Sequence, residues 1–110
     1  MRPKTLKILG KPFRLDYLTD QLDADLNGEC DCDKQLIRIR EGQPLEAEQD
    51  TVLHELIHAI DEAVDSRMTE SQVKRLATGL LAVFKDNQRL TPYLRRKTNA
   101  PTKRRQQLGQ

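Results

Sequence analysis

The chain has 110 residues, of which 36% are hydrophobic and 33% charged, and its formal net charge is +2 at pH 7. A chain of this length forms one domain around one modest hydrophobic core, which excludes multidomain architectures. No segment approaches the ~20 apolar residues of a membrane span, and the polar start, Met1–Lys4, lacks the apolar region of a secretory signal peptide. We therefore expect a cytoplasmic, monomeric protein without a membrane partner.

The charges are distributed unevenly along the chain. Residues 85–110 contain eight Lys or Arg and one acid, whereas residues 1–84 contain 11 bases and 16 acids. The first part is therefore acidic, as a cation-binding domain can be, and the end of the chain is basic. We predict a folded domain over residues 1–88 and a basic tail over residues 89–110.

The first forty residues predict two β-hairpins. Hydrophobic and polar residues alternate in residues 5–9 and again in residues 13–17, and Gly10-Lys11 between them can turn the chain. Residues 29–32 and 35–40 flank a second short polar turn in the same way.

The only cysteines, Cys30 and Cys32, form a C-x-C pair in the second hairpin. Both point to the same face of a strand, so we expect them to pack as small buried residues, with metal or redox use as the alternative. Two cysteines are too few for a disulfide framework, and their spacing differs from the C-x-x-C of zinc ribbons and thioredoxin-like motifs.

His54-Glu55-Leu56-Ile57-His58 is an H-E-x-x-H motif that contains the only two histidines. Residues 47–64 lack Gly and Pro and repeat hydrophobic residues at the spacing of an amphipathic helix. On a helix, His54 and His58 lie one turn apart on one face, where both imidazoles can bind one tetrahedral zinc ion. Glu55 is turned about 100° from His54, so its carboxylate can reach a water on the ion, as a general base must.

A second helix is predicted to begin at Thr69, which forms a capping box with Gln72. Hydrophobic residues between Val73 and Phe84 form one stripe on this helix. Asp86-Asn87 and then Pro92 are expected to end it.

Catalytic zinc takes three protein ligands and one water, so one ligand remains to be found. Glu70 extends the buried stripe of the second helix toward its packing partner, and it is our predicted third ligand. Alternatively, Glu70 only interacts with the dipole of its own helix. Asp61 is the rival ligand, although its place on the histidine face better suits a hydrogen bond to a ligand.

The tail carries two basic clusters, Arg95-Arg96-Lys97 and Lys103-Arg104-Arg105, and no hydrophobic period. We expect it to be disordered. The alternative is a weak, non-specific contact of Arg95–Arg105 with nucleic acid or an acidic partner, which would weaken steeply with salt.

Together these elements predict the α+β class, with a small antiparallel or mixed sheet from two hairpins packed on the H-E-x-x-H helix and a second helix. The motif region, followed by Met68–Val73, resembles the small phage- and prophage-encoded zincin metallopeptidases, which are loosely related to ImmA/IrrE-type peptidases. This resemblance covers roughly residues 5–90. It implies a minimal zincin fold with His54, His58 and Glu70 as zinc ligands and Glu55 as general base, acting in the host cytoplasm.

We therefore expect a zinc-dependent endopeptidase that hydrolyses a protein or peptide substrate with metal-activated water. An extended substrate would pair with residues 29–32 or 35–40. Two alternatives stay open. One is a non-catalytic phage regulator on the same fold that binds a host factor or nucleic acid. The other is a structural zinc site closed by four protein ligands.

Overall fold

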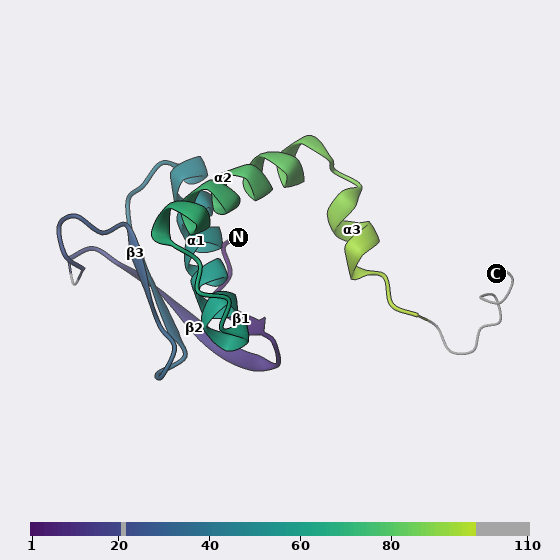
Figure 1. Ribbon diagram of the computed structural model, residues 1–110. Coiled ribbons are helices and arrows are strands. Elements are labelled where there is room, and N and C mark those ends of the chain that lie inside the picture. Colours follow the sequence, from purple (N-terminus) through teal and green to yellow (C-terminus); the bar gives the residue numbers. More distant parts are fainter. Residues whose placement is uncertain (21, 99–110) are drawn as a thin grey trace, which may run out of the picture.

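The computed structural model describes residues 1–20 and 22–98. Within these residues it has strands β1 (Thr5–Ile8), β2 (Lys11–Leu18), β3 (Gly28–Asp31) and β4 (Leu36–Arg40), and helices α1 (Leu45–Val64), α2 (Glu70–Asp86) and α3 (Leu90–Arg95). The predicted α+β class is confirmed, and the strands form a sheet beside α1 (Figure 1).

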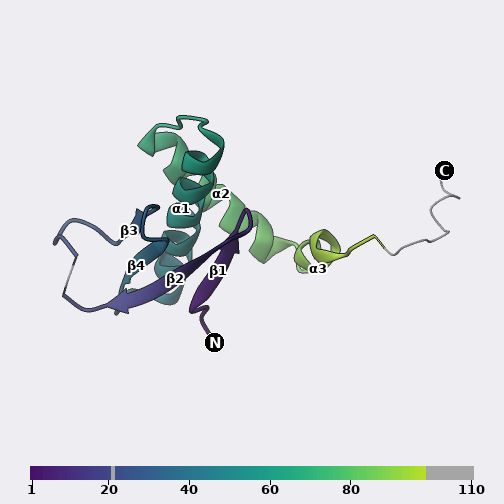
Figure 2. The same cartoon turned by 90° about the horizontal axis from the view of Figure 1, so that it is seen from below.

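The strands form one mixed sheet in the order β1-β2-β4-β3 (Figure 2). β1 pairs antiparallel with β2, and β3 pairs antiparallel with β4, so both predicted hairpins are confirmed. The two hairpins are joined by parallel pairing of β2 with β4. Because β4 is paired on both sides, residues 35–40 cannot add another strand, and that half of the substrate-pairing prediction is wrong. β3 remains available at the edge of the sheet.

The first hairpin turns one residue earlier than predicted. Leu9 and Gly10 both have positive φ angles, 49° and 87°. Two successive positive φ angles are typical of a type I′ turn, whose twist matches that of the flanking strands. Glycine adopts this conformation without a steric penalty.

The main hydrophobic core lies between the sheet and α1. Alternate residues of the inner strands, Phe13, Leu15, Ile37 and Ile39, point toward α1 and pack with Ala59. The residues between them on β2 and β4, Arg14 and Arg38, are charged and lie on the opposite face of the sheet. This alternation makes α1 the cover of one sheet face.

α2 packs on α1 through a smaller cluster formed by Ile57, Val73 and Ala77. The predicted capping box begins this helix: Thr69 Oγ1 accepts a hydrogen bond from the Gln72 backbone N–H at 3.1 Å, and Gln72 Oε1 accepts one from the Thr69 N–H at 2.8 Å. The cap and the packed cluster together determine where the first turn of α2 lies relative to α1.

The tail prediction, disorder over residues 89–110, is wrong at its start: Leu90–Arg95 forms the short helix α3. Six residues are too few for a recognisable hydrophobic period. Pro92 falls in the first turn of α3, where a missing N–H removes no intrahelical hydrogen bond. Figures 1 and 2 show α3 away from the sheet, and none of its residues is buried.

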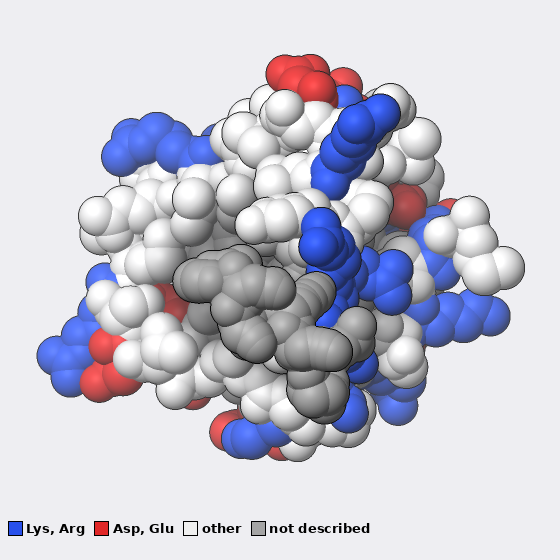
Figure 3. Space-filling model, turned by 90° about the vertical axis from the view of Figure 1, so that its right-hand side faces the viewer, with Lys and Arg blue, Asp and Glu red and all other residues white. Residues whose placement is uncertain are grey.

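Lys and Arg side chains gather on the face seen from the side of α3 (Figure 3). Most of the tail prediction, including the cluster Lys103-Arg104-Arg105, falls on residues 99–110, which lie outside the described residues.

None of the helices in the described part of the chain has the combined length and hydrophobicity needed to cross a bilayer.

Candidate metal centre

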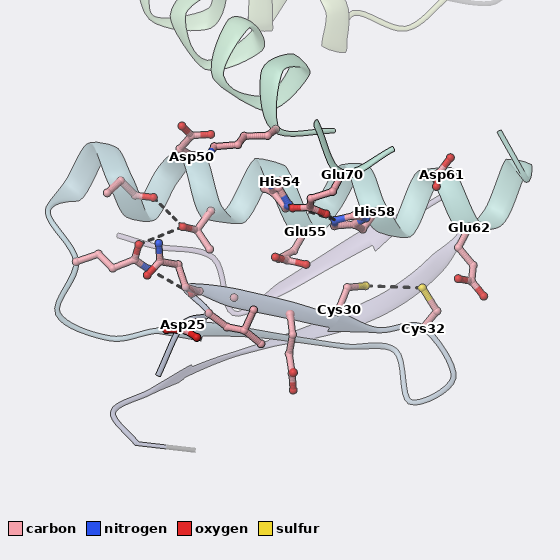
Figure 4. Close-up of a pocket in the computed structure, with 18 residues that line it drawn as sticks. Asp25, Cys30, Cys32, Asp50, His54, Glu55, His58, Asp61, Glu62 and Glu70 are labelled. Atoms are coloured by element: carbon pink, nitrogen blue, oxygen red, sulfur yellow. Dashed lines mark hydrogen bonds and ion pairs between the residues drawn. The ribbon is translucent and has the colours of Figure 1, made fainter. Parts of the chain in front are cut away.

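α1 and α2 bring His54, His58 and Glu70 together (Figure 4). The two imidazole Nε2 atoms lie 3.1 Å apart. The Glu70 carboxylate faces both rings, with Oε2 2.7 Å from His54 Nε2 and Oε1 2.9 Å from His58 Nε2. All three residues predicted as zinc ligands therefore direct their donor atoms toward one point.

One donor atom from each of the three side chains lies within 4.8 Å of the other two, close enough for the three residues to share one ion. With zinc–nitrogen and zinc–oxygen bonds of about 2.0–2.2 Å, neighbouring ligand atoms lie roughly 3.3 Å apart. The observed distances are 2.7 to 3.1 Å, which are hydrogen-bond lengths, and the two from Glu70 start at its two different oxygens. Side-chain rotations would therefore be needed to admit an ion. Two imidazoles and one carboxylate are also the ligand set of zinc peptidases that keep one position open.

Local and tertiary structure contribute differently to this arrangement. The i, i+4 spacing alone places His54 and His58 one turn apart on α1. Glu70 is three residues before Val73, which is fully buried against α1. Because i and i+3 share a face of a helix, the packing of Val73 directs Glu70 toward the histidines.

Asp61, the rival ligand, has a different role. Its carboxylate accepts hydrogen bonds from the Ser66 hydroxyl and from the Met68 backbone N–H, the latter at 3.0 Å. These hydrogen bonds hold the pKa of Asp61 below its usual value, and the hydrogen bond from Ser66 makes the largest contribution. Asp61 therefore stabilises the turn that leads into α2, and it is not among the three converging donors.

We expect Glu70→Ala to weaken zinc binding at least about 100-fold, because it removes a ligand, and Asp61→Asn to change affinity only a few-fold. Asparagine is the better probe at position 61, since its carbonyl oxygen can still accept the turn hydrogen bonds. Competition with a zinc-binding dye would measure both affinities. Tight binding by Glu70→Ala together with loss of zinc in Asp61→Asn would contradict the ligand assignment.

Glu55 is buried, with 5% of its surface exposed, and points from α1 toward β3 (Figure 4). Its carboxylate has no hydrogen-bond partner among the described residues. Burial, followed by repulsion from Glu70 and Glu29, raises its pKa to about 7. A carboxyl group with a pKa near neutrality can both accept and return a proton, as a general base in hydrolysis must.

The three donors and Glu55 line a cleft of about 800 Å³, which lies between α1, the start of α2, and β3 with the loop before it. Gly28 lets β3 lie close to α1. A Cβ atom at this position would be 2.6 Å from Thr51 Cγ2, 3.1 Å from the Arg38 carbonyl oxygen and 3.2 Å from Glu55 Cγ. This role could not be predicted from the sequence, because the only local signal was a glycine at the end of an acidic loop.

Gly28→Ala should therefore destabilise the fold by about 1–3 kcal/mol, because the methyl group overpacks the space between β3 and α1. Thermal unfolding should show a fall in Tm of several degrees. Gly79→Ala is a matched control: nothing lies within 4 Å of a Cβ at this helical position, so the same substitution should stabilise α2. Equal Tm values for the two variants would contradict the close approach at Gly28.

Cys30 and Cys32 lie beside the cleft with their Sγ atoms 3.7 Å apart, and both are free thiols. They pack partly buried against the main core, in agreement with the expected structural role. Burial is the main cause that raises the pKa of both thiols above its usual value. At neutral pH they are therefore thiols, whereas a metal ligand or nucleophile is a thiolate.

Comparison with known protein families, with curated proteins and with solved structures finds no match for this chain.

Proposed function

We propose that this protein is a zinc-dependent metallopeptidase with a minimal zincin fold, similar to the small phage-encoded enzymes, and that it cleaves within a protein or peptide substrate. The observation that carries the proposal is the convergence of His54, His58 and Glu70 beside the buried Glu55 in an open cleft. A closed structural site would need a fourth protein ligand. Among the described residues only these three side chains converge, which favours an open position.

In the proposed reaction His54, His58 and Glu70 hold the ion. A zinc ion held there would supply Lewis acidity, lowering the pKa of a water molecule and polarising the carbonyl of the scissile bond. The Glu55 carboxylate accepts a proton from the attacking water and then donates it to the leaving amine.

The free edge of β3 is suited to hold the substrate. Arg40 N–H donates to the Asn27 carbonyl, so hydrogen-bonded pairs between β3 and β4 fall on odd-numbered residues of β3. In an antiparallel pair, the intervening residues direct N–H and C=O away from the partner strand. The backbone groups of Gly28 and Cys30 are thus available to an extended peptide lying along the cleft.

The proposal is tested by comparing new protein amino termini produced in host lysate by the zinc-loaded native protein and by Glu55→Gln. We expect new termini only with the native protein. Identical sets with both proteins would refute catalysis at this site and would support the alternative of a non-catalytic binding protein.

A further inference from the structure

We infer that the cleft selects an extended peptide with Lys or Arg on both sides of the bond that lies at the metal centre. This inference rests on the proposed function and names its substrate class. Seven of the eight Asp, Glu, Lys and Arg residues that line the cleft are acidic, and Lys74 is the only base. An 800 Å³ cleft of this composition favours cationic ligands over anionic ones.

Four of these carboxylates are not needed by the metal centre and have no Lys or Arg partner within the described residues: Asp25, Asp50, Asp61 and Glu62. Glu29, by contrast, pairs with Arg38. Asp25 and Glu62 are exposed and make no hydrogen bond in the described part of the chain. Their charges are therefore available to a ligand.

The four carboxylates lie on both sides of the metal centre. Asp50 is one helical turn before His54, and Asp61 and Glu62 lie about one turn after His58. Asp25, in the loop before β3, lies at the Asp50 end of the cleft, so acidic groups flank the histidines on both sides (Figure 4). A peptide crossing the centre meets negative charge before and after its scissile bond.

The helix geometry gives the spacing of the expected basic residues. Asp50 and Glu62 are separated by about 18 Å along the axis of α1, at roughly 1.5 Å per residue. An extended peptide covers that distance in five to six residues, at about 3.3 Å each. Because the histidines lie midway, the basic side chains should fall about two to three residues on either side of the scissile bond.

A second observation, the burial of one of these side chains, also indicates that this cleft holds a ligand. Glu55 is buried, unpartnered among the described residues and directed into the cleft, beside the free backbone groups of β3. A polyanion such as nucleic acid would be repelled by this surface, so an extended basic peptide is the occupant that fits both the strand edge and the charge.

Binding can be measured without cleavage in zinc-loaded Glu55→Gln protein. The probes are two fluorescein-labelled eight-residue peptides that differ at only two positions. These positions are the third residue before and the third residue after the central peptide bond. One peptide has Arg at both positions, and the other has Glu. By fluorescence anisotropy at 50 mM NaCl we expect the Arg peptide to bind at least about 10-fold more tightly, and its affinity to fall at 300 mM NaCl.

Asp25→Asn/Glu62→Gln, added to the same protein, should weaken binding of the Arg peptide about 3–30-fold, because it removes one carboxylate from each end of the cleft. The matched control is Asp16→Asn/Asp86→Asn, which makes the same change in net charge on the outer face of the sheet and at the end of α2. It should change affinity less than 2-fold. Equal affinity for the two peptides, or an equal loss in both double variants, would overturn the inference.

Cleavage by the native zinc protein separates this inference from the proposed function. Cleavage of the Glu peptide as fast as the Arg peptide would overturn the charge selection and leave the peptidase assignment intact. Tight, cleft-dependent binding of the Arg peptide with no cleavage would overturn the peptidase assignment and support the binding inference.

Discussion

Glu55→Gln should reduce kcat/KM for peptide hydrolysis by at least about 10²–10⁴-fold, while one zinc per chain is retained. Glutamine has nearly the shape of glutamate, but it cannot accept a proton from water. The proposed ligands His54, His58 and Glu70 are unchanged in this variant, so metal content should not change. Steady-state kinetics with a quenched fluorescent peptide, together with elemental analysis of the same sample, measure both quantities.

Two controls accompany this variant. Glu46→Gln makes the same change at an exposed position on α1 outside the cleft and should retain full activity.

The second control is the thermal stability of the metal-free protein as a function of pH. Because the pKa of Glu55 is raised to about 7, its ionisation destabilises the folded metal-free protein as pH rises from about 4.5 to 7, and this cost is fully present at pH 8.

Metal-free Glu55→Gln should therefore unfold at pH 8 at a temperature at least as high as the native protein does. Its advantage should disappear below about pH 4.5, where the glutamate is neutral in both states. Hydrolysis by Glu55→Gln at the native rate would contradict the role of Glu55 as general base.

His54→Ala/His58→Ala should lose stoichiometric zinc entirely. These are the only histidines of the chain, and the variant leaves Glu70 as the sole member of the cluster. A single exposed carboxylate does not hold zinc at micromolar concentration. Elemental analysis after dialysis against a weak chelator measures the loss, and the protein must be purified without a histidine tag, which would bind zinc itself.

Cys30→Ser/Cys32→Ser is the matched control, because it removes the two thiols that line the cleft and leaves the proposed ligands unchanged. This variant should keep one zinc per chain. Retention of a full equivalent by the histidine variant, with loss in the cysteine variant, would place the metal at the thiols and contradict the proposed centre.

The elements of the fold were predicted best where the signal is local. Alternation over residues 13–17 and 35–40 gave both hairpins, and Thr69 with Gln72 correctly marked the start of α2. Such patterns depend on contacts between residues a few positions apart, so they can be read without knowledge of the rest of the fold. The short helix α3 was missed because six residues contain too little of that signal.

The pairing of β2 with β4 could not be predicted in the same way. It joins two hairpins across the loop that contains residue 21, and it decides that β4 is internal and β3 lies at the edge. No alternation pattern distinguishes an edge strand from its hairpin partner. The importance of Gly28 follows from the same cause, since it depends on how closely β3 approaches Thr51 and Glu55.

At the candidate site, the sequence by itself determined that His54 and His58 share one face and that Glu55 is turned away from it, because a helix has a constant rotation per residue. Only the tertiary structure placed Glu70, and not Asp61, against the histidines and made Glu55 a buried group. Glu70 is 12 residues from His58 in the sequence, and it reaches the histidines because Ile57 packs against Val73 and Ala77. Burial of Glu55 likewise requires β3, since a helix alone cannot remove one of its own side chains from water.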